Sequence, residues 1–542
     1  MSRREAWLST AGIFVVGLLI RVAVASQIVF PKPEDTAYYV GVARNLVEGR
    51  GLVSDALWSY QTPPLVFPRP AFEVWLPLPS FLNAIPMALL GPTFAASQWV
   101  AVILGSIVPV LAWRLAADIA EERGLSRERA RTLAIGTGLT TAVYLPLLLH
   151  SALPDSTMPF TVLALGACLL MTRIARDPRG GRLADPRLLG LGVLIGLAAL
   201  TRNEAAYIGL AWLIVAWGIA GLSGGARARL VVVAAVVAGL VFLPWAVRDW
   251  VVFGSPFPGQ AVANAFSVSG FDIFAWNDPP TLSRYLAVGP QQLVQMRIDG
   301  LAHNFLNVLI LPGVPISLIG FVGLPWAVRG LAIRPVAIVA ITTFLVTSLV
   351  FPVATTWGTF LHAAGPAQVL LVVSALLALD AAIAWVGRQR GWTKPVAWLG
   401  ATLGVAGSLL FTVAVLPSFG AGSQSTADQY RTLAEVMQEV GHPLDNTAGP
   451  VITNFPIWMA ETQRIPSLAL PDEPPRDVLN LASTFGAKLL VLLDADSTHW
   501  PADLANGVDG AQCFHEIDLK TAAGPARAEI MGNARAFEVA CP

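Results

Sequence analysis

Charge is scarce in this chain. Only 13% of its 542 residues are charged, whereas soluble domains carry about 25%. The 35 basic and 35 acidic residues cancel to a net charge of +0, so no overall charge attracts nucleic acid, and none is expected as a partner. Hydrophobic residues make up 55% of the sequence. This balance excludes an ordinary soluble protein and predicts a polytopic α-helical membrane protein.

Metal-binding and redox patterns are also lacking. The 6 histidines form no His-Glu-x-x-His motif and no close pair, and the 3 cysteines form no Cys-x-x-Cys. No phosphate-binding loop, GxGxxG or DxD-style nucleotide-sugar site stands out. We therefore expect neither a metal nor another cofactor. Cys513 and Cys541 lie in the C-terminal tail, where an oxidising exterior allows either a disulfide or two unpaired thiols.

Long apolar runs are abundant. Because a span needs about 20 mostly apolar residues, we predict about 11 spans. They cover residues 10–29, 95–115, 132–150, 157–173, 187–201, 205–221, 229–247, 304–327, 333–351, 362–386 and 395–416. The first has a basic start and no clear small-residue cleavage site, so we expect a retained signal-anchor helix. The run 72–92 is interrupted by Pro77, Pro79 and Pro86, which predicts an interfacial or re-entrant segment rather than a span.

Arginines gather in alternate loops between these spans. The clusters are Arg3 and Arg4, Arg123 to Arg131, Arg176 to Arg187 (with Arg179 and Arg182), Arg227 and Arg229, Arg329 and Arg334, and Arg388 to Lys394. Cytoplasmic loops are rich in Lys and Arg, so we expect a multi-pass cell-membrane protein with its N-terminus in the cytoplasm and its C-terminus outside. Loops 30–94 and 248–303 then face outward.

Hydrophobicity falls after about residue 420. The periodicity there predicts a helix over 428–441, a strand over 449–454, a helix over 474–486 and a buried strand over 488–494. Alternating helices and strands indicate an α/β domain. We therefore predict a transmembrane domain over residues 1–420 and an exocytoplasmic α/β domain over 421–542.

Two adjacent carboxylates, Glu34 and Asp35, follow the first span and open an amphipathic helical pattern that carries Tyr39. Asp35 stands where an N-cap belongs, so capping is one interpretation. The other is catalytic, because an ionised carboxylate at an outward-facing membrane surface can deprotonate an acceptor hydroxyl. Glu34 would then help to hold acceptor or water, or else it is a solvated loop residue.

Further candidates lie in the turns that face the same side. Asp155 either caps the next span or orients substrate opposite Asp35. Arg202 and Glu204 are either an ion-paired interfacial anchor or a site at which Arg202 clamps a phosphate. The remaining substrate-binding candidates are Tyr39, Arg69, Arg248 and His362, and the simpler interpretation of His362 is an interfacial residue.

An arginine late in the first span, an acidic residue in the following loop and Tyr-x-x-x-Ala-x-x-Leu-x-x-Gly resemble the C superfamily of membrane glycosyltransferases (GT-C). Residues 67–92 resemble the family's proline-rich segment, with Arg69-Pro70 where mannosyltransferases usually have His-Pro-Pro. Segments 151–160, 199–205 and 243–258 also look like family segments. In this chain the first pattern falls on Arg21, Asp35, Tyr39, Ala43, Leu46 and Gly49, and the later segments hold Asp155, Arg202 and Arg248.

This resemblance implies a function. The most similar groups are the protein O-mannosyltransferases and the bacterial aminoarabinose transferases, which use polyprenyl-phosphate sugars outside the cytoplasm and whose first-loop aspartate is regarded as catalytic. It implies inverting transfer of a sugar from a polyprenyl-phosphate donor to a lipid, glycan or protein acceptor, with Asp35 as the base. Two rival interpretations are a flippase for lipid-linked sugars, which should show internal repeats that the sequence lacks, and a non-catalytic membrane assembly protein.

Overall fold

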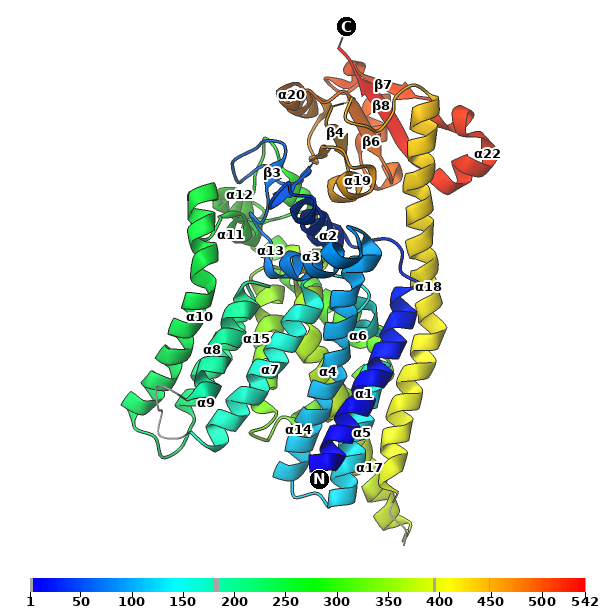
Figure 1. Cartoon of the computed structure of the whole chain (residues 1–542). Coiled ribbons are helices and arrows are strands. Elements are labelled where there is room, and N and C mark those ends of the chain that lie inside the picture. Colours follow the sequence, from blue (N-terminus) through cyan, green and yellow to red (C-terminus); the bar gives the residue numbers. More distant parts are fainter. Residues whose placement is uncertain (1–2, 179–184, 393–395, 448, 542) are drawn as a thin grey trace.

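The structure is a computed structural model that describes residues 3–178, 185–392, 396–447 and 449–541. A helical bundle forms its lower part in Figure 1, and a small α/β domain stands above it. The N-terminus lies at the far end of the bundle from that domain. Of the arginine-rich loops, Arg179, Arg182 and Lys394 lie outside the described residues.

Six helices in the described ranges are long and apolar enough to cross a membrane. They are α1 (Arg3–Ala25), α4 (Phe94–Glu122), α7 (Thr157–Arg176), α10 (Gly224–Phe253), α17 (Gly365–Gln389) and α18 (Ala397–Glu439). One further segment passes the same test only as a pair bent by 116°, which is either a broken span or a re-entrant loop: α13 (Gly289–Ala302), η4 (His303–Ile310) and η5 (Leu311–Gly313) lead into α14 (Ile316–Ala327).

The other predicted spans fall on shorter helices, so fewer than the predicted 11 qualify by length alone. These helices are α5 (Arg127–Ala142), α6 (Leu145–His150), α8 (Pro186–Ala199), α9 (Ala205–Trp217), α15 (Arg334–Leu349) and α16 (Thr359–Ala363). Predicted span 132–150 is broken between α5 and α6, where Pro146 is the second residue of the new helix.

The proline-interrupted run contains α3 (Leu78–Leu90), whose 13 residues are too short to cross a membrane. Its Ile85, Leu89 and Leu90 are exposed, whereas Ser80, Asn83 and Met87 are buried. This two-faced helix lies across the upper end of the bundle (Figure 1), in agreement with the interfacial segment that the prolines predict.

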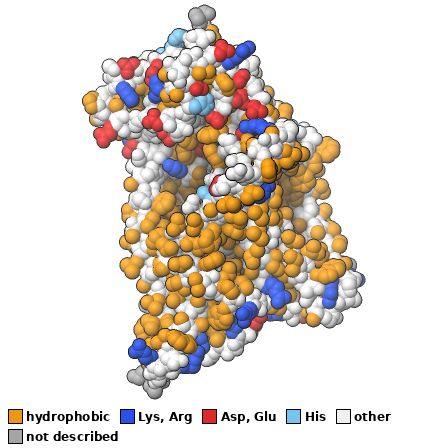
Figure 2. All heavy atoms as spheres, turned by 180° about the vertical axis from the view of Figure 1, so that it is seen from behind, with side chains coloured by type: hydrophobic (Ala, Val, Ile, Leu, Met, Phe, Trp, Pro, Cys, Tyr) orange, Lys and Arg blue, Asp and Glu red, His pale blue; other side chains and the backbone are white. Residues whose placement is uncertain are grey.

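Surface composition agrees with a membrane-embedded bundle. Figure 2 shows a hydrophobic band between the charged surface of the α/β domain and the opposite end of the molecule, where Lys and Arg gather. At that end Arg127 of α5 pairs with Glu5 of α1 at 2.6 Å. The clustering of basic side chains there is the arrangement that positive cytoplasmic loops produce.

The two long loops contain several short elements. In the first loop they are α2 (Glu34–Val47), β1 (Val53–Ser54), β2 (Ala56–Leu57) and β3 (Arg69–Pro70), with β1 and β3 antiparallel. The long later loop contains α11 (Gln260–Ala263), η2 (Asn264–Phe266), η3 (Gly270–Phe274) and α12 (Leu282–Ala287), and η6 (Ala354–Trp357) precedes α16. Helices α2 and α3 lie between the bundle and the α/β domain (Figure 1).

The C-terminal region matches the predicted helices and strands. It contains β4 (Val451–Thr453), α19 (Pro456–Gln463), β5 (Ser467–Ala469), α20 (Pro475–Phe485), β6 (Leu489–Leu492), η7 (Ala495–Ser497), α21 (Trp500–Ala505), η8 (Ala511–Cys513), β7 (Phe514–Ile517), α22 (Leu519–Met531) and β8 (Arg535–Val539). Cys513 and Cys541 are joined by a disulfide, which decides between the two states that the sequence left open.

One sheet unites this region with the first loop. The strand order is β2-β5-β4-β6-β8-β7, with the first four strands parallel and the last two antiparallel to their neighbours. The edge strand β2 comes from the first loop, and α18 runs without a break through residue 420 into the α/β domain. The two units are therefore built from shared elements.

Candidate active site

Asp35 is the second residue of α2, at the end of the helix that borders a cavity. The N-cap is Pro33, and the helix has no side-chain cap, so the capping interpretation of Asp35 is wrong. A helix N-terminus favours a negative charge. The Asp35 side chain is 25% exposed, and it is therefore accessible to a molecule in the cavity.

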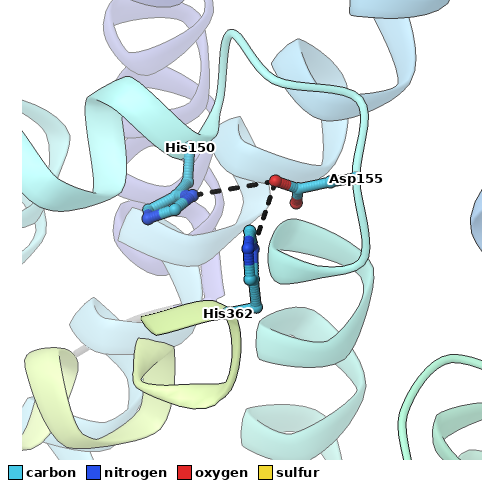
Figure 3. A group of neighbouring side chains, drawn as sticks. All are labelled: His150, Asp155 and His362. Atoms are coloured by element: carbon cyan, nitrogen blue, oxygen red, sulfur yellow. Dashed lines mark ion pairs between the residues drawn. The ribbon is translucent and has the colours of Figure 1, made fainter. Parts of the chain in front are cut away.

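His362 lies between Asp35 and Asp155. Its Nε2 is 3.3 Å from Oδ2 of Asp35, and its Nδ1 is 3.3 Å from Oδ2 of Asp155. Figure 3 shows both His362 and His150 pointing toward the Asp155 carboxylate, with His150 Nδ1 at 3.9 Å from Oδ2. Three segments far apart in sequence thus form one charged cluster.

Asp155 is held firmly in this cluster. Its side chain is fully buried, its Oδ1 accepts a hydrogen bond from the Thr157 amide at 2.7 Å, and Thr36 donates to Oδ2 at 3.4 Å. The Thr157 bond lies at the start of α7, so Asp155 stabilises that helix end while it faces His362. The helix-end interpretation of Asp155 is thus supported by this contact, and its substrate-orienting role stays a prediction.

Opposing effects set the charges of this cluster. Burial raises the pKa of Asp35; His362 and Arg202 oppose this, and the net direction is upward. Burial also works against an ionised Asp155, but the neighbouring His362 and His150 hold the pKa of Asp155 well below its usual range. Burial disfavours a charged His362, yet Asp155 and Asp35 outweigh it and raise the pKa of His362. A protonated imidazole that bridges carboxylates fits these directions.

The same cluster offers ligands of the kind that divalent cations use. One ligand atom each from His150, Asp155 and His362 lie within 4.8 Å of one another. Imidazole nitrogen with carboxylate oxygen suits zinc and similar ions. No metal site was expected from the sequence, because the two histidines are far apart in the chain.

Arg202 reaches the cavity from the turn between α8 and α9. It donates to Ser156 Oγ at 2.8 Å, to the Thr359 carbonyl at 3.0 Å and to both oxygens of Glu204, the shorter bond at 2.8 Å. These contacts fix the guanidinium with its charge close to Asp35. Arg202 is thus both an ion-paired anchor and a cationic wall of the cavity, and Glu204 is its partner.

The cavity has a volume of about 460 Å³, within the range of small-molecule sites. Polar residues of its lining include Asp35, Tyr39, Glu73, Arg202, Glu204 and Asp249. Aromatic side chains make up much of the remainder, among them Trp58, Phe72, Trp75, Phe242, Phe257 and Trp357. A lining that combines charged groups with aromatic and other apolar side chains suits an amphiphile with a polar head.

Two arginine candidates lie outside this lining. Arg69 is fully buried, pairs with Glu73 at 3.0 Å and donates to the carbonyls of Ser59 and Thr62, so its guanidinium holds the first loop together. Arg248 pairs with Asp249 at 2.9 Å and lies over the rings of Trp245 and Phe253. In each of these two pairs it is the acidic partner, Glu73 or Asp249, that lines the cavity.

Glu34 points away from the cavity. Its Oε1 accepts hydrogen bonds from the backbone amides of Ile457 at 2.9 Å and Trp458 at 3.4 Å in the α/β domain. It is therefore no solvated loop residue, and it lies next to Asp35 in sequence without sharing its environment.

Sequence reasoning missed several residues of the site. His150 carries a weak local signal, since it precedes Asp155 by five residues. The only sequence signal for three further site residues is that they directly follow the predicted aspartates: Thr36 follows Asp35, and Ser156 and Thr157 follow Asp155. Glu73 gave no signal beyond its place in the first loop.

No protein-family model matches the chain, and no curated protein matches it in sequence. Solved structures do match. ArnT from Cupriavidus metallidurans, bound to undecaprenyl phosphate, is 13% identical with a TM-score of 0.58, and the match covers 99% of both chains. The oligosaccharyltransferase AglB from Archaeoglobus fulgidus, in complex with an inhibitory peptide and a dolichol-phosphate, is 15% identical with a TM-score of 0.53.

The AglB match covers 94% of this chain and 72% of AglB. A second AglB structure, tethered to an acceptor peptide containing an NVT sequon, is 18% identical with a TM-score of 0.54 and the same coverage. These likenesses confirm the predicted fold class. The chain is a polytopic helical membrane protein that shares the GT-C fold of ArnT and AglB and carries an α/β region at its C-terminus.

Proposed function

We propose that this protein transfers a sugar from a polyprenyl-phosphate carrier to an acceptor on the exocytoplasmic side of the cell membrane. The observation that carries the proposal is that Asp35 and Arg202 both line one cavity, whose walls include many aromatic side chains. The shared fold supports it, since ArnT binds undecaprenyl phosphate and AglB a dolichol-phosphate in the matched structures.

Asp35 is the general base of this mechanism. Its carboxylate takes the proton of the acceptor hydroxyl, and the oxygen attacks the anomeric carbon of the donor sugar. The bond from that carbon to the phosphate oxygen breaks, and polyprenyl phosphate leaves with the electron pair. Attack from the face opposite the leaving group inverts the anomeric configuration. The raised pKa of Asp35 makes it the stronger base once it is ionised.

Arg202 stabilises the departing phosphate. A guanidinium already held by Ser156, Thr359 and Glu204 needs little reorganisation when charge develops on the leaving group. Tyr39 and Glu204 face the same space and contact the sugar or phosphate, and Arg248 is a second cation near the cavity, at Asp249. His362 favours the ionised form of Asp35, and Asp155 holds His362 in position beside it.

The test is a donor panel. Purified protein is incubated with a series of polyprenyl-phosphate sugars, and free polyprenyl phosphate is followed by mass spectrometry for wild type, Asp35→Asn and Asp509→Asn. Asp509 is an exposed aspartate of the α/β domain and serves as the control. We expect release by wild type and the control but a loss of about 10²-fold to 10⁴-fold in Asp35→Asn.

Each other outcome is informative. Equal release by all three proteins keeps the transferase and removes Asp35 from its chemistry. Release from no donor by folded protein, with candidate acceptors supplied, contradicts the proposal and favours the flippase.

A further inference from the structure

The first loop and the α/β domain form one hydrophobic core. Tyr38, Leu57 and Trp58 of the loop pack in the same buried cluster as Leu468 and Leu490 of the domain. Strand β2 pairs in parallel with β5, the Ser467 amide donates to the Asp55 carbonyl at 3.0 Å, and the Tyr60 hydroxyl donates to the Ala469 carbonyl at 2.5 Å. The domain is thus continuous with the loop that carries Asp35.

Helix α2 lies against helix α19 and is clamped to it at two places. Arg44, near the end of α2, forms a buried ion pair with Glu461 of α19, and its Nη1 donates to Glu461 Oε2 at 2.6 Å. At the beginning of α2, the Glu34 carboxyl accepts hydrogen bonds from the backbone amides of Ile457 and Trp458.

The Glu34 contact has a clear physical role. The first amides of a helix have no partner within the helix, and a side chain at the N-cap usually accepts one of them. In α19 the N-cap is Phe455, which cannot do so, and no side-chain cap is formed within the domain. Glu34 supplies the missing acceptor from another part of the chain. The indole of Trp458 returns a hydrogen bond to the Pro31 carbonyl at 2.9 Å.

Asp35 follows Glu34 directly, so the two side chains leave the first turn of α2 in different directions. One enters the α/β domain and the other borders the cavity beside His362. We propose that Glu34 is a positioning residue through which the α/β domain fixes Asp35 in the active site. This inference rests on the proposed function and gives the α/β domain a part in it.

The role of Glu34 requires an acceptor atom and no proton transfer. Burial raises the pKa of Glu34 to about 8; the two backbone hydrogen bonds oppose this rise, and the negative charge of Asp35 adds to it. Its neutral form therefore prevails at neutral pH, and glutamine reproduces that form in shape and in acceptor oxygen. Alanine removes the acceptor.

The experiment compares Glu34→Gln, Glu34→Ala and a control, Glu48→Gln. Glu48 also contacts the α/β domain, at Arg464 and 3.3 Å, but on the exposed surface. Release of polyprenyl phosphate gives kcat and KM, and hydrogen exchange reports the amides of residues 456–463. For Glu34→Ala we expect kcat to fall about 10-fold to 100-fold with an unchanged KM for the donor, and faster exchange at Ile457 and Trp458.

The kcat of Glu34→Gln and of Glu48→Gln should stay within about 3-fold of wild type, since both variants keep an acceptor at residue 34 for the amides of Ile457 and Trp458. Loss of activity in Glu34→Gln with unchanged exchange would overturn the inference, because it would give Glu34 a direct chemical role. Wild-type activity in Glu34→Ala would overturn it as well, while the proposed function stands.

Failure of the proposed function looks different. Wild-type protein would then release nothing from any donor. Exchange that stays slow at Ile457 and Trp458 in Glu34→Ala would refute the contact itself, whereas faster exchange would keep Glu34 as the link between loop and domain.

Discussion

Replacing His362 by glutamine tests whether a cationic imidazole keeps Asp35 ionised. Two unit charges 3.3 Å apart interact by about 5 kcal/mol at an effective dielectric constant of about 20. The Asp35 side chain is 25% exposed, so solvent screens much of this. If one third survives, about 1.5 kcal/mol, the ionisation equilibrium changes about 10-fold.

The direction follows from the sign of the charge that is removed. His362 lowers the pKa of Asp35, so its loss raises that pKa further, and Asp35 becomes protonated at a higher pH. A protonated base cannot accept the acceptor's proton. We therefore expect the acid limb of the kcat/KM profile of His362→Gln to move by about one pH unit to higher pH, with a loss of up to about 10-fold on that limb and recovery under alkaline conditions.

The assay is the pH dependence of polyprenyl phosphate release. A matched control is His499→Gln, because His499 also lies between two carboxylates, Asp472 at 3.0 Å and Asp503 at 2.7 Å, but in the α/β domain. The control should keep the wild-type profile. An acid limb of His362→Gln that is unchanged or displaced to lower pH would refute the electrostatic role of His362.

Three further predictions follow from the same contacts. Arg202→Gln should lower kcat at least about 10-fold and Arg202→Lys less, because lysine keeps the charge without the planar fork; equal loss in both, measured by steady-state kinetics, would argue against a charge effect. If a divalent ion is bound by His150, Asp155 and His362, a chelator should abolish release and metal analysis should find one ion per chain. If protein shown to be free of metal keeps its activity in the presence of chelator, the cation beside Asp35 is the His362 imidazole. Glu34 has a pKa raised from 4.5 to about 8, so its contribution to stability is complete below about pH 4.5 and is lost as pH rises through about 8. The midpoint of thermal unfolding should therefore fall between about pH 6 and pH 9, by less in Glu34→Gln; an equal fall in both proteins contradicts this assignment.

Local patterns in the sequence predicted the local features of the fold. Apolar runs indicated the bundle, three prolines indicated the interfacial helix α3, and the alternation after residue 420 indicated β4, α20 and β6. Six of the predicted spans are single helices long enough to cross a membrane, whereas a run such as 132–150 breaks into two helices that hydropathy does not separate.

The site was predictable only where its residues lie close to recognisable patterns. Asp35 was found because it follows a span and opens a helix. His150 and His362 are separated by more than 200 residues, and only the tertiary fold brings their rings to 5.7 Å. The partner of Glu34 lies 423 residues away. No periodicity encodes such distant contacts.

The most direct test of the account is a single turnover of donor by Asp35→Asn. Protein in excess is mixed with a donor that wild type uses, and bound donor and released polyprenyl phosphate are measured over time. The account predicts normal donor binding, since Arg202 and the aromatic walls are intact, with release slowed about 10²-fold or more. Release at the wild-type rate would contradict the central claim that Asp35 is the base.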